Sequence, residues 1–178
     1  MTRRAFSLLL LIAVAIPGFG QLAAPGADNS PKVGDVAPDF AIPAPNRGAP
    51  PTNLKDFQGK KKVLLMFFPG AFTPGCTTEF TEAGQSYDKF TAMNIEMLGI
   101  SADLPGAQGK FKETVGAKNT FVSDRSLDIA KKYDAANPNF AKRYYFLIDE
   151  TGKIVWKSTN NSLIPTEKLL TDLAQFKK

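Results

Sequence analysis

Residues 63–79 read VLLMFFPGAFTPGCTTE, and this stretch predicts how the chain folds around its only cysteine, Cys76. Residues 63–68 are a continuous apolar run of strand length, which is typical of a central strand covered on both faces. A proline and a glycine end that run. From Thr77 onward apolar residues recur at every third or fourth position, which predicts a helix whose inward stripe contains Phe80, Ala83, Tyr87 and Phe90. The pattern therefore places Cys76 at the start of a helix that follows a buried strand.

The rest of the chain alternates between predicted strands and helices. Strands are expected at residues 95–101, 120–123, 144–149 and 153–158, the last two joined by a tight hairpin. Helices are expected at residues 106–115, 127–133 and 166–176, with Ser123 and Asp124 as candidate caps of the second. Residues 40–42 and 52–54 are candidates for a small ribbon. This alternation predicts an α/β domain with a central mixed β-sheet and helices on both faces.

The first residues predict export. Arg3 and Arg4 precede an apolar run at residues 5–16, and Pro17 follows that run, as in a signal peptide. We expect residues 1–20 to be removed, residues 21–31 to form a flexible linker, and residues 32–178 to form one domain. An ordinary leader and a twin-arginine leader both fit the paired arginines. The expected location is periplasmic or secreted, with no stable membrane anchor once the leader has been cleaved.

Composition excludes several classes of function. The formal net charge is +5, and it includes the two arginines of the leader. The lysine clusters at 60–62 and 177–178 are expected to flank a strand and to end a helix, so no nucleic-acid partner is predicted. The chain contains no histidine, which excludes Cys-His and Ser-His catalysis and most zinc sites.

The predicted position of Cys76 favours a reactive thiolate. The free N–H groups and the dipole at a helix start stabilise an anion, so a cysteine there ionises more readily. Thr73 supplies a hydroxyl three residues before the sulfur. Beyond the leader the chain has three arginines, of which Arg47 and Arg125 lie in turn-rich stretches and are expected to be solvated. Arg143 immediately precedes an apolar strand, which makes it the candidate cation for the site.

These residues carry a resemblance to a known family. The spacing of Pro69, Thr73 and Cys76, followed by RYYFLID at 143–149, resembles the active-site pattern of the peroxiredoxins, thiol peroxidases with a thioredoxin-like fold. LGISAD at 98–103 and AKKY at 130–133 are similar to the Q-type group, also called bacterioferritin comigratory proteins. The resemblance covers nearly all of the chain after the predicted leader.

The resemblance implies a role for each matching residue. Cys76 would be the nucleophile that attacks the peroxide bond and becomes a sulfenic acid. Thr73 and nearby backbone N–H groups would hold the peroxide oxygens, and Arg143 would stabilise the thiolate and the developing charge. Pro69 would shield the pocket from water, and Glu79 is a candidate to orient the arginine. The implied substrates are hydrogen peroxide and small organic hydroperoxides, and neither a metal nor an organic cofactor is expected.

One departure from the family concerns turnover. Q-type members often carry a resolving cysteine five residues after the nucleophile, but this chain has Thr81 there and no second cysteine. The resemblance therefore implies a one-cysteine cycle, in which an external thiol, a thioredoxin-like reductant or the Cys76 of a second chain restores the thiol. Both a monomer and a homodimer fit. The alternative function is an exported redox-sensing or binding module with little peroxidase turnover.

Overall fold

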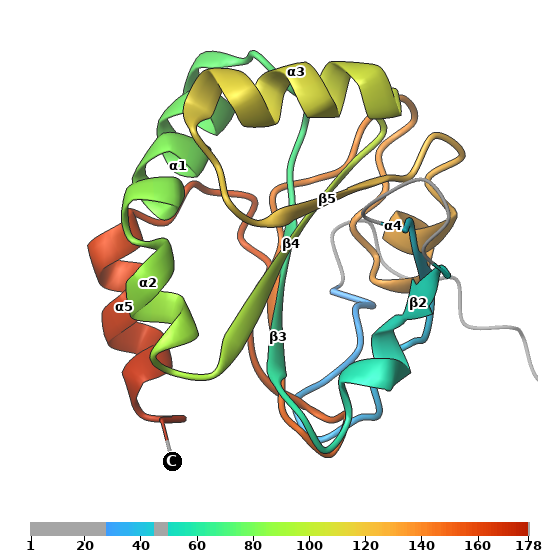
Figure 1. Cartoon of the computed structure of the whole chain (residues 1–178). Helices are drawn as coiled ribbons and strands as arrows, with labels where there is room; N and C mark the ends of the chain where they lie inside the picture. The colour runs from blue at the N-terminus through green and yellow to red at the C-terminus, as the bar shows by residue number, and fades with distance from the viewer. Residues whose placement is uncertain (1–27, 45–49, 178) are drawn as a thin grey trace, which may run out of the picture.

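A five-stranded mixed sheet lies at the centre of the molecule, with helices on both of its faces (Figure 1). The computed structural model of the chain describes residues 28–44 and 50–177. In the order β5-β4-β3-β6-β7, the strands are β5 (Thr120–Ser123), β4 (Ile95–Ser101), β3 (Lys62–Phe67), β6 (Tyr145–Ile148) and β7 (Ile154–Ser158). The first three are parallel to one another, whereas β6 and β7 are antiparallel to their neighbours. The predicted mixed sheet and terminal hairpin are confirmed.

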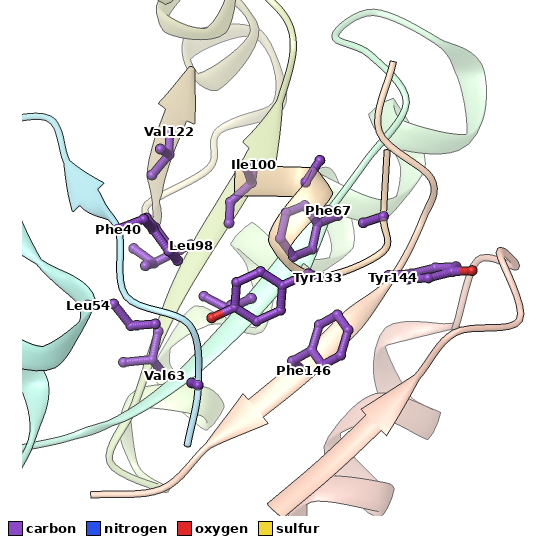
Figure 2. Packing of buried hydrophobic residues seen from close by; sticks show 14 of the residues in the cluster. Phe40, Leu54, Val63, Phe67, Leu98, Ile100, Val122, Tyr133, Tyr144 and Phe146 are labelled. Carbon is purple, nitrogen blue, oxygen red and sulfur yellow. The ribbon is translucent and has the colours of Figure 1, made fainter. Parts of the chain in front are cut away.

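The strands alternate between two cores because successive side chains point to opposite faces of a sheet. Every residue of β3 is buried. One core, shown in Figure 2, takes side chains from β3, β4, β6 and the residue after helix α4 (Asp128–Lys132), among them Val63, Phe67, Leu98, Ile100, Tyr133 and Phe146. The other core takes the alternate residues, including Leu64, Met66, Met97, Tyr145 and Leu147. The central strand therefore stabilises both layers.

The two faces carry different elements (Figure 1). One face is covered by α1 (Pro74–Gln85), α2 (Tyr87–Thr91), α3 (Pro105–Val115) and α5 (Thr166–Ala174). The opposite face is covered by α4 (Asp128–Lys132), the 3-10 helix η1 (Leu54–Phe57) and the ribbon formed by β1 (Ala41–Ile42) and β2 (Thr52–Asn53). Helices on both faces and the small ribbon are thus confirmed. Within residues 28–44 and 50–177, no helix combines the length and the apolar character that a membrane span needs.

The structure corrects the bounds of the helix predicted from Thr77. It begins three residues earlier, at Pro74. Proline fits the first turn of a helix, because an N–H group there would have no partner within the helix. The helix also ends at Gln85, since Ser86 has φ −97° and ψ 9°, and a separate helix starts at Tyr87. The inward stripe continues across this break, because Phe80 and Phe90 are both fully buried. A periodic pattern alone could not separate one helix from two that share a face.

The helix predicted at 127–133 is confirmed in a shorter form, α4. Leu127 has a left-handed backbone conformation, with φ 57°, immediately before it. The carboxylate of Asp124 accepts hydrogen bonds from the backbone N–H groups of Ile129 at 3.1 Å and Ala130 at 2.8 Å. The expected acidic cap is therefore present, although it reaches the helix from four residues before Asp128.

Two segments pack more tightly than the sequence predicts. Lys62, expected to flank a strand, is the first residue of β3 and only 4% exposed, and its ammonium pairs with Glu150 at 2.9 Å. Asp28 and Ser30 lie in the predicted flexible linker, yet Lys157 on β7 donates hydrogen bonds to both side chains. Ordered contacts therefore begin before residue 32. The predicted leader and the first part of the linker, residues 1–27, lie outside the described residues.

Candidate active site

Cys76 is the third residue of α1 and is fully buried. The chain leaves β3, turns through residues 68–73 and enters the helix at Pro74, with Thr73 in an extended conformation just before it. The first helical hydrogen bond runs from the N–H of Thr77 to the carbonyl of Thr73, at 2.9 Å. Earlier N–H groups of a helix have no partner within it, so the sulfur lies where donors and the helix dipole favour an anion. The predicted position of the thiol is therefore confirmed.

Arg143 reaches the sulfur because β6 runs antiparallel to β3. Met66 pairs with Tyr145, so the residues just before β6 lie beside the end of β3, where the chain turns toward Cys76. The Nη2 atom of Arg143 donates a hydrogen bond to Cys76 Sγ at 2.9 Å. The backbone N–H of Arg143 donates to Asn161 Oδ1 at 2.7 Å, which holds the start of this segment against the loop after β7.

Glu79 joins the site from the next turn of α1. Its Oε2 accepts a hydrogen bond from Arg143 Nε at 3.0 Å, and its Oε1 accepts one from the Tyr145 hydroxyl at 2.6 Å. The side chains of Arg143 and Glu79 are 13% and 2% exposed, so this ion pair is screened little by solvent. One guanidinium therefore contacts both the carboxylate and the sulfur.

Electrostatics follow from this burial. Burial raises the pKa of Glu79, and the Tyr145 hydroxyl and the Arg143 guanidinium oppose that rise. Burial lowers the pKa of Arg143, but the Glu79 carboxylate and the Cys76 sulfur outweigh it, so the net shift is upward. Burial, followed by the charge of Glu79, also raises the pKa of Tyr145. Tyr145 is therefore a hydroxyl donor and Arg143 a permanent cation at neutral pH.

Thr73 and Pro69 line the turn between β3 and α1. The Thr73 hydroxyl donates to the carbonyl of Gly70 at 3.1 Å and does not cap the helix through its side chain. It keeps its lone pairs for a second partner, because a hydroxyl has one donor and two acceptor positions. Pro69 is partly buried and lies two residues after the end of β3.

The turn itself is held by residues whose role the sequence did not reveal. Asp103 Oδ2 accepts hydrogen bonds from the N–H of Ala71 and from the Ser101 hydroxyl, both at 2.8 Å. Phe72 adopts a left-handed backbone conformation, with φ 63°, and its side chain is 52% exposed. These contacts fix the approach of the chain to Cys76 from the neighbouring strand β4.

Of the two arginines expected to be solvated, only Arg125 lies among the described residues, and it does not join the site. Arg125 is exposed and donates to the carbonyl of Ala102 at 3.4 Å, as expected for a solvated turn. Arg47 lies outside the described residues. Sequence reasoning missed Tyr145 and Asn161, and only the alternation of faces along β6, which puts Tyr145 on the same side as α1, could have indicated the former.

Comparisons with known proteins agree with one another. The AhpC/TSA family profile matches residues 33–157. Peroxiredoxin Bcp of Escherichia coli K12 is 34% identical over 134 residues, which cover 71% of this chain and 84% of the relative. Peroxiredoxin Bcp of Bacillus subtilis 168 is 30% identical over 132 residues, covering 70% and 82%. The crystal structure of peroxidoxin BcpB from Mycobacterium tuberculosis superposes with a TM-score of 0.73 at 26% identity, covering 83% of this chain and 99% of that one.

Proposed function

Since the chain belongs to the AhpC/TSA family of peroxiredoxins and is a thiol-dependent peroxidase with a thioredoxin-like fold, we propose that Cys76 reduces hydrogen peroxide and small organic hydroperoxides. The observation that carries this assignment is the 2.9 Å hydrogen bond from Arg143 Nη2 to Cys76 Sγ. Arginine stays protonated at any physiological pH, so it favours the thiolate form of the sulfur.

The first step is nucleophilic substitution at oxygen. The Cys76 thiolate attacks one oxygen of the peroxide, an S–O bond forms, and the O–O bond breaks. The electron pair of that bond leaves with the second oxygen as hydroxide, or as alkoxide from an organic hydroperoxide, which takes up a proton to become water or an alcohol. Cys76 is oxidised to a sulfenic acid and the peroxide is reduced.

We assign the supporting roles to Arg143, Thr73 and Pro69. Arg143 donates to charge that develops on the peroxide oxygens while it stays in contact with the sulfur. The Thr73 hydroxyl, already donating to the Gly70 carbonyl, accepts a hydrogen bond from the peroxide O–H. Pro69, which is partly buried after β3, shields the reacting sulfur from water. A fixed donor aimed at a developing oxyanion is worth about 2.7–4 kcal/mol, so Arg143 acts mainly on the transition state.

Regeneration needs a thiol from outside the chain. Thr81 stands where a resolving cysteine would lie, and the chain holds one cysteine in total. An external thiol attacks the sulfenic sulfur, a mixed disulfide forms and water leaves. A second thiol of the reductant then attacks the mixed disulfide and releases reduced Cys76, with both reductant thiols joined in a disulfide. Because Cys76 is fully buried, a thioredoxin-like protein must meet a locally opened start of α1, whereas a small thiol needs less opening. The sensing or binding module is the less favoured alternative, since the named relatives are peroxiredoxins.

The experiment that tests the function measures peroxide consumption by the chain without its predicted leader, from residue 21 onward, with dithiothreitol as the thiol. We expect catalytic consumption that the Cys76→Ser variant lacks. Equal rates for the parent and this variant would overturn the assignment, and oxidation of only one equivalent would favour the sensing module.

We also propose that the protein is exported, on the basis of Arg3, Arg4 and the apolar run that follows them. Expression of the full chain in a Gram-negative host, followed by fractionation and N-terminal sequencing, tests this. A periplasmic product that begins near residue 21 is expected. A full-length product confined to the cytoplasm would refute export and leave the peroxidase assignment intact.

A further inference from the structure

Tyr145 is a buried polar residue that the proposed chemistry does not use. Its side chain is fully buried, in the core cluster that also contains buried side chains of α1 and α5. Its hydroxyl nevertheless has two partners. It donates to Glu79 Oε1 at 2.6 Å and accepts from the backbone N–H of Ile164 at 3.4 Å.

We propose that Tyr145 is a positioning residue of the peroxidase site, whose hydroxyl fixes the Glu79 carboxylate and thereby holds the Arg143 guanidinium against Cys76. The inference rests on the proposed function of Cys76 and extends it to a residue that does not touch the sulfur. Hydrogen bonds link Ile164 to Tyr145, Tyr145 to Glu79, Glu79 to Arg143 and Arg143 to Cys76 in one continuous series.

The geometry of the carboxylate carries the first step. Each oxygen of Glu79 has one partner, Tyr145 on Oε1 and Arg143 on Oε2. A carboxylate held at both oxygens cannot turn about its terminal torsion, which is otherwise broad. The Tyr145 hydroxyl therefore sets where Oε2 lies, and with it where the Nε–H group of Arg143 must point.

The shape of the guanidinium carries the second step. Its N–H groups lie in one rigid plane, so fixing the direction of Nε also fixes the directions of the Nη groups. Arg143 uses Nε for Glu79 and Nη2 for Cys76. A carboxylate that turned would thus move the donor that faces the sulfur, and misplacement of a catalytic group by about 1 Å can cost about a hundredfold in rate.

The third step concerns the charge of the Glu79 carboxylate. Burial raises the pKa of Glu79, and the Tyr145 hydroxyl is the first of the groups that oppose this rise. The titratable groups that face Glu79 are Arg143 and Tyr145, from the chain around the start of β6, and Cys76 lies one turn earlier on its own helix. Removal of the hydroxyl leaves Arg143 to oppose the effect of burial, so the carboxylate takes up a proton at higher pH and its hold on the arginine weakens.

The test compares two tyrosine-to-phenylalanine variants by stopped flow with hydrogen peroxide. Tyr145→Phe keeps the ring and removes the hydroxyl. Tyr133→Phe is the matched control, because it also removes the hydroxyl of a fully buried ring, which donates a part-buried hydrogen bond to the Pro38 carbonyl at 2.8 Å on the opposite sheet face. We expect Cys76 oxidation to slow about tenfold in Tyr145→Phe, less than on removal of the guanidinium, and to keep the parent rate in Tyr133→Phe.

Two further measurements separate positioning from general destabilisation. The acid side of the rate profile should move to higher pH in Tyr145→Phe and stay in place in Tyr133→Phe. In a Glu79→Gln background, the extra loss from Tyr145→Phe should be much smaller than in the parent, since both residues act through Arg143. Parent-like rates and an unmoved profile in Tyr145→Phe would overturn the positioning role. A parent protein no faster than Cys76→Ser would instead overturn the peroxidase function.

Discussion

The Nη2 atom of Arg143 lies 2.9 Å from the sulfur of Cys76, although the two residues are 67 positions apart in the chain. The antiparallel pairing of β3 and β6 brings them together, because the last residues of β3 lie beside the first residues of β6. The contact therefore depends on the register of two central strands, which is fixed by the alternation of their buried side chains. The pairing of β3 with β6 therefore both stabilises the core and sets the geometry of the site.

Removal of the guanidinium should slow the reaction. In Arg143→Ala the sulfur loses its cationic donor, and the developing oxyanion loses a fixed one, so the second-order rate of Cys76 oxidation should fall at least about tenfold. Stopped-flow mixing with hydrogen peroxide measures this rate. Arg125→Ala is the matched control, because Arg125 is exposed and lies outside the site, and it should keep the parent rate.

The Thr73 hydroxyl should matter as a specific hydrogen-bonding group. Thr73→Val keeps the branched shape and removes the hydroxyl, so we expect the same rate to fall at least about tenfold. Thr78→Val is a suitable comparison, since the exposed Thr78 hydroxyl also bonds only a backbone carbonyl, that of Pro74 at 3.2 Å. If Arg143→Ala and Thr73→Val both react at the parent rate, the geometry assigned to the site is wrong.

The raised pKa of Glu79 predicts a pH dependence of stability. Since the folded protein binds this proton more tightly than the unfolded chain, the free energy of unfolding contributed by Glu79 falls as pH rises from the unfolded pKa to the folded pKa. The slope is at most about 1.4 kcal/mol per pH unit. Urea unfolding of the parent and Glu79→Gln should show the parent losing stability relative to the variant as pH rises through this range. A difference that stays flat or grows in favour of the parent would contradict a raised pKa of Glu79.

Substitution by alanine should have opposite effects on protein stability at two helical glycines. A Cβ at Gly84 of α1 would lie 2.9 Å from the backbone oxygen of Gly116, which is too close, so Gly84→Ala should destabilise the protein by about 1–3 kcal/mol. A Cβ at Gly109 of α3 would meet nothing within 4 Å, so Gly109→Ala should stabilise it by about 0.5–1 kcal/mol. Denaturant unfolding checks both values. Equal effects of the two substitutions would mean that α1 does not pack against Gly116 as described.

Much of the fold was predictable because the three central strands, β3, β4 and β6, are buried along almost all of their length. The strands at 95–101 and 120–123 match β4 and β5 residue for residue, since apolar runs bounded by turns leave little freedom in placing them. The break at Ser86 was not predictable, because both helices continue one inward stripe. The burial of Lys62 was missed as well, since its partner Glu150 becomes a neighbour only when β3 pairs with β6.

The site was predictable in its residue types and less so in its contacts. Cys76, Thr73 and Arg143 carry a recognisable spacing, and the contact between Cys76 and Arg143 follows from strand topology. The hydrogen bonds of Tyr145 and Asn161 depend instead on side-chain directions and on the loop after β7, which no local pattern determines. Such supporting groups emerge only from the assembled structure.

The proposed function requires this site to turn one buried cysteine into a fast peroxide reductant. The most direct measurement mixes the reduced protein with one equivalent of hydrogen peroxide under stopped flow, follows the fluorescence of Trp156, the only tryptophan, and traps the product for intact mass. We predict a fast step that is absent from Cys76→Ser and that yields a sulfenic acid on Cys76. Oxidation no faster than that of a free thiol would contradict the claim, because it would mean that Arg143 and Thr73 do not stabilise the transition state.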